Sequence, residues 1–344
     1  MDGPREEETD VKSTDPVGTG PPGRNDVMNE GGGAAVRRPQ LDGPTWSAQS
    51  RLARSSGRAG WERRLRRVTR ESMVRALQPT HRLRMLPGFL IVGAQRCGTT
   101  SLFYVLSRHP AVFTPIGNRK ELHFFDDEYD RGLGWYQSQF PIRARARITA
   151  RDTHVEPAAF EGSPNYMFHP QVPARIHRHL PGVRLLVLVR DPVERAYSQH
   201  AHQVGRGMET EPFERALELE DARIDGEAGR LAADPAHESR AYWLYAYRTR
   251  GHYADQLEHL ERVFGREQIH VIDSGDFFAD PGPDYDRVLE FLSLPHLGHP
   301  AFTPRNVRPR APMPESVRLA LEEHFRPHDE RLAAWLGRVP SWRR

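Results

Sequence analysis

Cysteine is almost absent from the sequence: Cys97 is the only one, which excludes an intrachain disulfide and a zinc cluster built from cysteines. Lysine is nearly as rare, because Lys12 and Lys120 are the only lysines among 49 lysines and arginines. Such a bias is typical of a genome that favours arginine codons. An arginine at a position where lysine is usual is therefore weak evidence of altered chemistry.

Long apolar runs and a strong net charge are also missing. No run approaches the roughly 20 residues that a membrane-spanning helix needs. The N-terminal stretch MDGPREEETD is acidic and lacks the apolar segment of a secretory signal, so we expect a reduced, soluble, cytoplasmic protein. The net charge of +3 gives no support to a nucleic-acid-binding role.

The composition divides the chain into three parts. Residues 1–57 hold a single aromatic side chain, Trp46, and are predicted to be a disordered tail. Residues 58–84 are rich in arginine, with apolar positions near helical spacing, and predict a basic helical lead-in. Such a helix either lies on an anionic membrane or packs one face on the domain, and we favour packing. Residues 85–340 are expected to form the functional domain.

Strand and helix patterns alternate along this domain. Short apolar runs predict buried strands at 89–92, 183–189 and 268–273, and a weaker strand at 154–162. The predicted helices start after residue 98, span 134–140 and 170–180, begin again at 193, fill most of 213–264, and lie at 285–294, 315–325 and 329–335. This alternation predicts an α/β fold like the P-loop-containing nucleotide-binding folds, with a central parallel sheet flanked by helices.

The segment Gly88–His109 is expected to organise this fold. A buried strand ends at Gly93, the chain passes through Ala-Gln-Arg-Cys, and a helix starts at Gly98. Backbone N–H groups and a helix N-terminus then converge on one point, which favours a phosphate-like anion. The spacing is that of a Walker A loop, but Thr99 occupies the lysine position. The loop therefore lacks the side chain that reaches the β- and γ-phosphates of a nucleoside triphosphate.

A second anion-binding element follows the strand at 183–189. Arg190 stands at its carboxyl end, and Ser198 lies about two turns into the next helix. An arginine offers two parallel hydrogen bonds to a phosphate, and a serine hydroxyl adds a further donor. The carboxyl ends of parallel strands share one edge of the sheet, where ligands bind. The sequence therefore favours a ligand with two separated anionic groups over ATP.

The pair GAQRCGTTSL and LVLVRDPVERAYSQH resembles the 5′-phosphosulfate loop and the 3′-phosphate motif of PAPS-dependent sulfotransferases. PAPS, 3′-phosphoadenosine 5′-phosphosulfate, is the sulfuryl donor that this family shares. The chain is most similar to bacterial sulfotransferases and heparan sulfate sulfotransferase domains, in which segments like KELHFFD and SPNYMFHPQVPARI lie between the two motifs. The resemblance covers about residues 86–338.

This resemblance implies a role for each motif. The loop at 94–101 would surround the 5′-phosphosulfate, and the implied contacts are Arg96, Cys97, Gly98, Thr99, Thr100 and Ser101. Arg190 and Ser198 would bind the 3′-phosphate. Glu121 in KELHFFD matches the glutamate taken as general base, and His123 is a second catalytic candidate. PAPS is the implied co-substrate, and no metal is expected.

Three departures from the family accompany these matches. Arg96 replaces a lysine thought to stabilise the leaving oxygen, and it keeps the charge but is a poorer proton donor. A lysine often found near SPNYMF is missing, because Glu161 and Gly162 stand there, and the heparan group's C-terminal cysteine pair is absent. The acceptor stays open: a hydroxyl, or in second place an amine, of a glycan, lipid or small molecule.

Two other functions compete with sulfuryl transfer. One is a P-loop kinase, which would need a loop lysine and an acidic residue for magnesium. The other is a non-catalytic nucleotide-binding or membrane-peripheral protein that uses residues 58–84.

Several further side chains have a structural interpretation beside a functional one. Cys97 is expected to pack in the core, and the acidic residues at 218–221 to form a solvated face. The aromatic residues at 242–247 either belong to the core or line an acceptor pocket. Arg308 and Arg310 lie where a late loop could close over the donor nucleotide.

Overall fold

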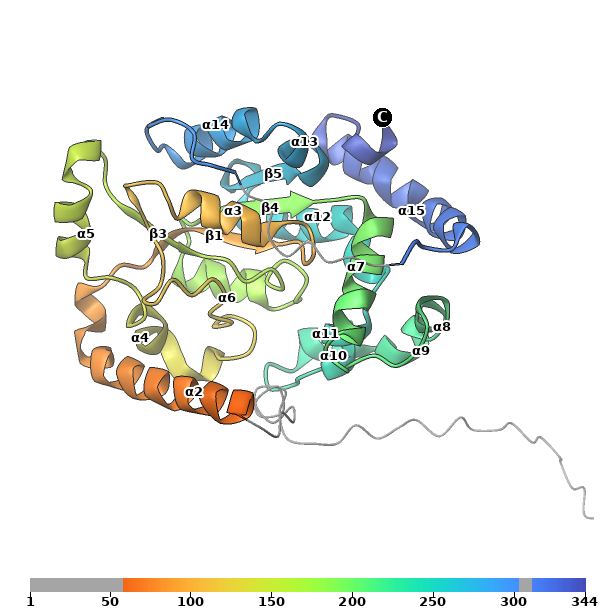
Figure 1. Ribbon diagram of the computed structural model, residues 1–344, viewed down its shortest axis with the longest axis horizontal. Coiled ribbons are helices and arrows are strands. Elements are labelled where there is room, and N and C mark those ends of the chain that lie inside the picture. Colours follow the sequence, from red (N-terminus) through yellow and green to blue (C-terminus); the bar gives the residue numbers. More distant parts are fainter. Residues whose placement is uncertain (1–57, 303–310) are drawn as a thin grey trace, which may run out of the picture. The chain divides into compact units, whose positions relative to one another are not determined.

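The computed structural model describes residues 58–302 and 311–344. The tail predicted at 1–57, and the loop with Arg308 and Arg310, therefore lie outside the described residues. The described chain contains a five-stranded sheet in the order β2-β3-β1-β4-β5, and every neighbouring pair is parallel (Figure 1). The strands are β1 (Pro87–Gly93), β2 (Val112–Phe113), β3 (Ala158–Glu161), β4 (Arg184–Val189) and β5 (Ile269–Asp273).

The predicted α/β class, with a parallel sheet flanked by helices, is confirmed. Strands β1, β3, β4 and β5 lie at the four predicted apolar runs. Strand β2 was not predicted, because two residues are too few to show an alternating or continuous apolar pattern. Strand β4 is buried along almost its whole length, as a central parallel strand covered on both faces must be.

Helices follow the strands and cover the sheet (Figure 1). Those nearest the site are α3 (Thr99–Leu106) after β1, α7 (Pro192–Val204) after β4, and α12 (Tyr253–Phe264) before β5. The other helices are α2 (Arg58–Leu77), α4 (Gly132–Gln137), α5 (Arg143–Thr149), α6 (Val172–His179), α8 (Phe213–Glu218), α9 (Glu220–Ile224), α10 (Glu227–Ala233), α11 (Arg240–Tyr245), α13 (Ser274–Ala279), α14 (Pro281–Leu292) and α15 (Glu315–Leu336). Short 3-10 helices lie at Gln78–Leu83, Tyr129–Arg131, Arg151–Thr153, Thr249–Gly251, Arg266–Gln268 and Ser341–Arg343.

The C-terminal helix corrects one prediction. Two helices were expected at 315–325 and 329–335, but α15 runs through Pro327 without a break. A proline removes one backbone hydrogen bond and usually ends or kinks a helix. Here apolar side chains on both sides of the proline, among them Phe325 and Leu332, are buried on the same helix. Burying this continuous face outweighs the lost hydrogen bond.

The core places the carboxyl ends of β1 and β4 side by side. Residues Leu90 and Ile91 of β1 pair with Leu185 and Leu186 of β4, and Gly93 lies opposite Val187. The side chains of both strands are almost all buried in one large hydrophobic cluster. The loops that leave β1 and β4 therefore start as direct neighbours, which is the arrangement the two anion-binding motifs need.

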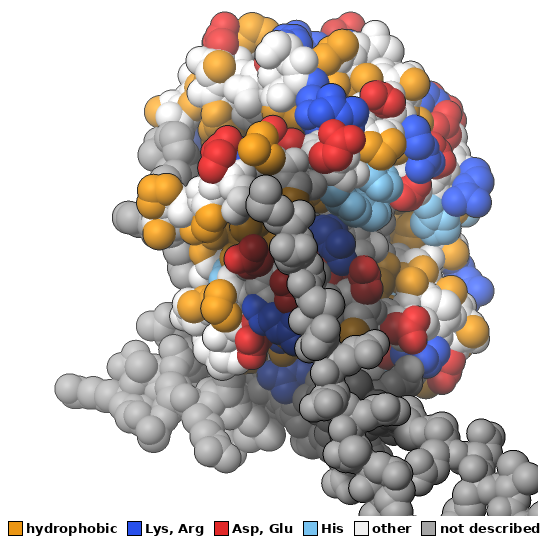
Figure 2. Space-filling view, turned by 90° about the vertical axis from the view of Figure 1, so that its right-hand side faces the viewer, with side chains coloured by type: hydrophobic (Ala, Val, Ile, Leu, Met, Phe, Trp, Pro, Cys, Tyr) orange, Lys and Arg blue, Asp and Glu red, His pale blue; other side chains and the backbone are white. Residues whose placement is uncertain are grey.

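The N-terminal lead-in contains helix α2, and its residue Val74 is buried. After it, Arg84 donates a hydrogen bond to the carbonyl oxygen of Phe140 at 2.7 Å. Among the described residues, none of the helices combines the length and the apolar character needed to cross a membrane. On the face drawn in Figure 2, acidic and basic side chains are interspersed.

Candidate active site

The loop after β1 is fixed by a backbone contact and by a glycine. Ala94 donates its N–H to the carbonyl oxygen of Leu188 at 2.7 Å, so the loop is tied to β4 from its first residue. Gly98 precedes α3 with φ of +91°, and a Cβ there would lie only 2.7 Å from the ring of Phe278. Only glycine fits both demands. Helix α3 therefore begins directly at the end of the loop, and the positive end of its dipole lies there.

The side chains of this loop differ in exposure. Thr99 and Ser101 are buried, whereas Arg96 and Thr100 are partly exposed. The thiol of Cys97 is fully buried, lies 3.5 Å from the hydroxyl oxygen of Tyr253, and has a pKa raised by burial. The thiol therefore serves packing. The predicted contact of Cys97 with the bound co-substrate stays a prediction.

Arg96 joins the two predicted anion-binding motifs. Its backbone has φ of +71°, and its Nε donates a hydrogen bond to the hydroxyl of Ser198 at 3.1 Å. Ser198 lies in α7, more than 100 positions along the chain from Arg96. The sequence predicted that both motifs share one sheet edge, and their side chains are in direct contact there.

Arg190 follows β4 directly. Its carbonyl oxygen accepts a hydrogen bond from the hydroxyl of Tyr253 at 2.9 Å, and its half-exposed guanidinium lies 3.7 Å from Glu194. The next residue, Asp191, caps α7 by accepting a hydrogen bond from the N–H of Val193 at 2.9 Å. The acidic residue that a kinase would need for magnesium after this strand is thus a helix cap. This use of Asp191 weighs against the kinase alternative.

Lys120 connects the loop to the candidate base. Its Nζ lies 3.0 Å from the hydroxyl oxygen of Thr99 and 2.9 Å from a carboxylate oxygen of Glu121. Its stem runs past Gly162, where an added Cβ would lie 3.5 Å from the Cε of Lys120. A lysine ammonium therefore does enter the region of Glu161 and Gly162, although that segment has no lysine. Lys120 is not among the predicted site residues, and the rarity of lysine in this chain is the one feature of the sequence that sets it apart.

Glu121 heads a chain of three side chains. Its second carboxylate oxygen lies 3.3 Å from Nε2 of His123, and Nδ1 of His123 lies 3.1 Å from a carboxylate oxygen of Asp126. Asp126 is fully shielded from solvent and also accepts a hydrogen bond from the Asn165 amide at 3.1 Å. His123 has φ of +54°, a conformation that turns its ring between the two carboxylates. Asp126 and Asn165 were not among the predicted site residues.

The side chains of Glu121, His123 and Asp126 keep one another charged. Burial disfavours the charged imidazole, but Asp126 and Glu121 together hold the pKa of His123 well above its ordinary value. Burial likewise opposes the charge of Glu121, yet His123 and Lys120 hold the pKa of its carboxyl far below the usual range. Against the same effect of burial, His123 and Asn165 lower the pKa of Asp126. Glu121 is therefore an ionised and oriented carboxylate beside the loop.

These geometric features agree with the comparison to known proteins. Residues 86–302 match the model of the family described as "Sulfotransferase domain". The chain belongs to the sulfotransferase family. The match covers all five strands and both anion-binding motifs. This membership makes the chain an enzyme of the transferase class.

Individual sulfotransferases align over most of the chain. A "Membrane-associated sulfotransferase kil1" from Dictyostelium discoideum is 24% identical over 82% of this chain and 72% of its own length. The human "Heparan sulfate glucosamine 3-O-sulfotransferase 5" is 32% identical over 62% of this chain, which spans only 55% of that relative. A crystal structure of a sulfotransferase from Alicyclobacillus acidocaldarius is 31% identical and superposes with a TM-score of 0.57, over 76% of this chain and 100% of that one.

The sulfotransferase has a pocket beside Asp126, the partner of His123. Its lining includes Asp127, His237, Glu238, Trp243 and Arg250. The ring of Trp243 meets the ring of His123 edge-on, with centroids 5.5 Å apart. Burial and the neighbouring charge of Asp126 raise the pKa of Asp127 to about 8. The pocket therefore combines an aromatic wall with carboxyl groups, and Asp126 in its lining is linked to the candidate base through His123.

The aromatic residues at 242–247 divide between the two roles that the sequence left open. Tyr242 stacks on Phe168, with centroids 4.4 Å apart, and Tyr247 is fully buried in a core cluster with α7 and α15. Trp243 and Tyr245 are both partly exposed: Trp243 lines the pocket, and Tyr245 packs against the same core cluster as Tyr247. One short segment thus supplies both core packing and a pocket wall.

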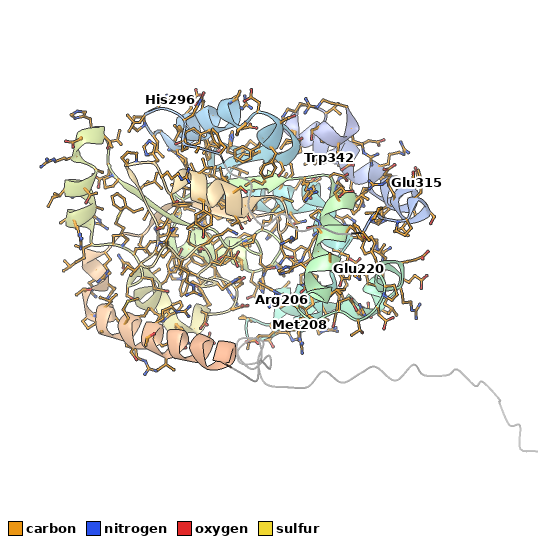
Figure 3. All side chains as sticks on the ribbon, in the orientation of Figure 1. Arg206, Met208, Glu220, His296, Glu315 and Trp342 are labelled. Atoms are coloured by element: carbon orange, nitrogen blue, oxygen red, sulfur yellow. The ribbon has the colours of Figure 1, made fainter. Side chains whose placement is uncertain are left out.

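The prediction of a solvated acidic face at 218–221 was wrong for one residue. Glu220, labelled in Figure 3, has no exposed surface. Its carboxylate accepts hydrogen bonds from the N–H groups of Arg248 and Thr249 at 2.7 and 3.0 Å, and from the Thr249 hydroxyl at 2.9 Å. It caps a distant turn, because a buried carboxylate is tolerated only where donors surround it. Glu218 and Asp221 are largely exposed.

Proposed function

We propose that the chain transfers the sulfuryl group of PAPS to a hydroxyl group of its acceptor. The observation that carries this proposal is the position of the Lys120 ammonium, 3.0 Å from Thr99 in the loop and 2.9 Å from Glu121. One cation thereby links the place where a phosphosulfate would lie to the group that would take the acceptor's proton. Family membership supports the choice of PAPS as donor.

The cationic side chains and hydrogen-bond donors at this edge of the sheet fit a molecule with phosphates at two positions. Arg96, Lys120 and the N-terminus of α3 surround the loop with positive charge and N–H donors, which suits the 5′-phosphosulfate. Arg190 and Ser198 lie on the same sheet edge and would hold the 3′-phosphate. The proposed loop contacts are those predicted from the sequence: Arg96, Cys97, Gly98, Thr99, Thr100 and Ser101.

The proposed reaction is an in-line displacement at sulfur. The acceptor oxygen forms a bond to sulfur while the bond between sulfur and the bridging phosphate oxygen breaks. The acceptor proton passes to the carboxylate of Glu121, and adenosine 3′,5′-bisphosphate leaves with the bonding electron pair. Lys120 and Arg96 would stabilise the negative charge that grows on the bridging oxygen. His123 would orient Glu121, with Asp126 fixing the imidazole.

The acceptor we propose is a hydroxyl of a glycan. The pocket beside Asp126 offers the flat ring of Trp243 and the carboxyl groups of Asp127 and Glu238, which can hydrogen-bond sugar hydroxyls. The relative described as a heparan sulfate glucosamine 3-O-sulfotransferase supports this class of acceptor. A cytoplasmic location stays a prediction of the sequence, and contact of residues 58–84 with a membrane surface stays the alternative to packing on the domain.

The test compares nucleotides first and acceptors second. Adenosine 3′,5′-bisphosphate is expected to raise the melting temperature, and ATP with magnesium to raise it little. Transfer of labelled sulfate from PAPS is then measured on a panel of glycans, lipids and phenols. Arg190→Ala and Glu121→Gln serve as controls for donor binding and for chemistry. Stabilisation by ATP alone would contradict the donor assignment, and labelling confined to lipids or phenols would contradict the glycan assignment.

A further inference from the structure

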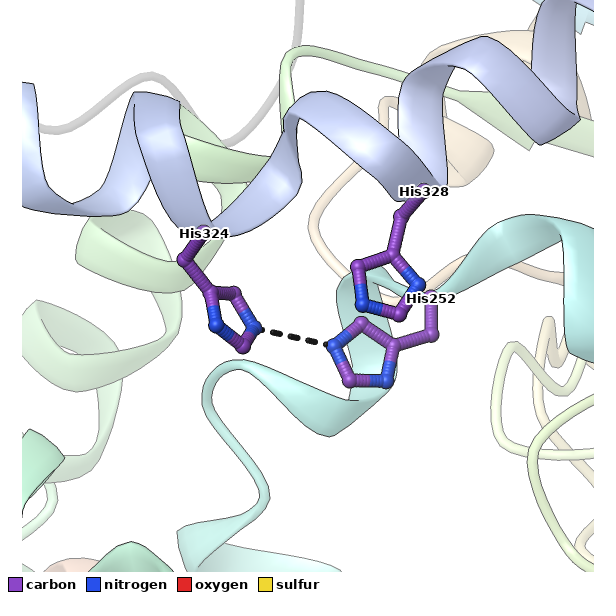
Figure 4. A group of neighbouring side chains, drawn as sticks. All are labelled: His252, His324 and His328. Carbon is purple, nitrogen blue, oxygen red and sulfur yellow. Dashed lines mark hydrogen bonds between the residues drawn. The ribbon is translucent and has the colours of Figure 1, made fainter.

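Three histidines from distant parts of the chain meet at the junction of α12 and α15 (Figure 4). His324 and His328 lie one turn apart on α15, so their side chains share one face of that helix. His252 immediately precedes α12 and points at both. The Nε2 atoms of His252 and His324 are 3.0 Å apart, and the ring of His328 stacks on His252 with centroids 3.7 Å apart.

The spacing of the ring nitrogens suits a small divalent ion. Each histidine offers one nitrogen, and the three nitrogens lie within 4.8 Å of one another. Zinc bound to imidazole at 2.0–2.1 Å in a tetrahedral site separates its ligand nitrogens by about 3.3 Å. The 3.0 Å pair is already near this value. His328 needs to turn its ring out of the stack on His252 to aim its lone pair at the same point.

The surroundings leave these imidazoles available as neutral ligands. The carboxylates around the three histidines are engaged by arginines: Asp255 with Arg331 at 2.6 Å, Asp221 with Arg248 at 2.7 Å, and Asp329 with Arg343 at 2.6 Å. Burial and the neighbouring histidines lower the pKa of His252 to about 3, and burial also lowers the pKa of His324. A neutral imidazole is the form that ligates metals.

We propose that His252, His324 and His328 form a binding site for a divalent transition-metal ion, with Zn²⁺ as the best fit. Three imidazoles suit Zn²⁺, Co²⁺, Ni²⁺ and Cu²⁺, and disfavour Mg²⁺ and Ca²⁺, which prefer oxygen ligands. The fourth position would hold water. All three histidines are partly exposed, so an ion can reach them from solvent. Histidine side chains are visible on the face of the molecule drawn in Figure 2.

The proposed ion would have a positioning role. His252 is followed by Tyr253, whose hydroxyl binds the carbonyl oxygen of Arg190 at 2.9 Å and contacts the thiol of Cys97. An ion that ties His252 to α15 would therefore brace the segment behind both anion-binding motifs. It would add to the ion pairs of Arg331 with Asp255 and Glu258, which already join these two helices. Binding of an ion by these histidines does not depend on which sulfuryl donor and acceptor the enzyme uses.

The described chain also supplies a matched control. Asp286, His296 and His299 form a second group with nitrogen and oxygen atoms in reach of one another, at the surface beside α14 (His296 is labelled in Figure 3). These three residues are exposed, and both imidazoles already contact the same oxygen of Asp286 at 2.8 Å. His296→Ala therefore removes a histidine from an acidic surface group without touching the proposed site.

The experiment uses the full chain without an affinity tag, stripped of metal by a chelator that is then removed. Titration calorimetry with Zn²⁺ is expected to show one tight site per chain and a rise in melting temperature. Co²⁺ is expected to give the visible absorption of a four-coordinate site with three imidazole ligands. His324→Ala and His328→Ala should each weaken Zn²⁺ binding by at least about tenfold, and His296→Ala should leave it unchanged.

Three results would overturn the proposal. The first is no saturable Zn²⁺ binding by the wild-type chain. The second is unchanged affinity in His324→Ala and His328→Ala, and the third is loss of the tight site in His296→Ala. If an alanine variant fails to fold, the Co²⁺ spectrum of the wild-type chain decides, because an all-oxygen octahedral spectrum contradicts three imidazole ligands.

Discussion

The donor side and the acceptor side of the candidate active site are held by different kinds of contact. On the donor side, the backbone of Ala94 is tied to β4, and a side-chain hydrogen bond joins Arg96 to Ser198. On the acceptor side, His123 lies between the charged carboxylates of Glu121 and Asp126. The buried carboxyl group of Glu161 is joined to His123 through the hydroxyl of Ser163. The donor side depends on backbone geometry, and the acceptor side on paired charge.

This difference determines how each side should respond to substitution. Removing one exposed or half-exposed donor costs the energy of one hydrogen bond to a charged group, about 1.5–3 kcal/mol. Removing one member of a buried charged network leaves its partner unpaired, which costs more. We therefore expect the largest effects on the acceptor side and graded effects on the donor side.

The largest effect is expected for Glu121→Gln. The amide cannot accept the acceptor's proton, so kcat for sulfuryl transfer should fall by roughly 10²–10⁴-fold. The affinity for adenosine 3′,5′-bisphosphate should change little, because Glu121 meets the loop only through Lys120. Labelled-sulfate transfer and calorimetry with the nucleotide measure the two quantities. Glu156→Gln, at an exposed side chain, is the matched control. Activity near the wild-type value in Glu121→Gln would remove the base assignment.

The second effect concerns stability, at Glu161. Burial raises the pKa of this carboxyl to about 7 from an ordinary 4.5. The folded chain therefore holds a proton that the unfolded chain releases between these values. The free energy of unfolding should fall as pH rises from about 4.5 to 7, by about 3 kcal/mol in total.

Glu161→Gln removes this titration. Relative to wild type, the variant should be more stable at pH 8 than at pH 5, by about the same 3 kcal/mol. Urea unfolding of both chains at the two pH values gives the difference. Glu214→Gln, at an exposed position of α8, should keep the wild-type slope. An equal slope in Glu161→Gln would mean that this carboxyl is ionised at neutral pH in the folded chain.

The same contrast explains what the sequence could predict. Strands β1 and β4 are continuous apolar runs, and the glycines after β1 have a fixed spacing, so the donor side could be read from local pattern. The meeting of Arg96 with Ser198 then follows from the parallel sheet, whose strand ends share one edge.

The acceptor side has no such local pattern. Side chains reach this side of the site from irregular segments, namely those of Asp126, Asn165 and Lys120. Which side chains do so depends on loop conformations such as the positive φ of His123. The burial of Glu220 depends on donors from a turn 28 positions further along the chain. The three histidines of the proposed metal site are separated by up to 76 positions, counted from His252 to His328. Periodicity and motif spacing carry no information on such contacts.

The third effect is on the donor side, at Arg190. Arg190→Ala should weaken the binding of adenosine 3′,5′-bisphosphate by about 10–100-fold, the cost of a charged hydrogen-bond partner. Binding of adenosine 5′-phosphate, which lacks the 3′-phosphate, should hardly change. Calorimetry with both nucleotides measures the selectivity, and Arg206→Ala, at an exposed position just after the end of α7, is the control. If Arg190→Ala weakens the binding of both nucleotides equally, Arg190 does not bind the 3′-phosphate.

The smallest effect is expected for Arg96→Lys, which restores the lysine usual in the family. The positive charge stays, and an ammonium with a lower pKa than guanidinium is the better proton donor, so kcat should remain within about threefold of wild type. The hydrogen bond from Nε to Ser198 is lost, and nucleotide affinity should fall by about 2–10-fold.

Arg96→Met separates charge from geometry at the same position. It removes both the charge and the hydrogen bond, so its kcat should fall well below that of Arg96→Lys, because nothing then neutralises the leaving oxygen from this side of the loop. Steady-state rates of sulfuryl transfer for the three chains measure this order. If Arg96→Lys is as impaired as Arg96→Met, the fork of the arginine and its contact with Ser198 matter more than its charge. The donor side would then be as finely positioned as the acceptor side.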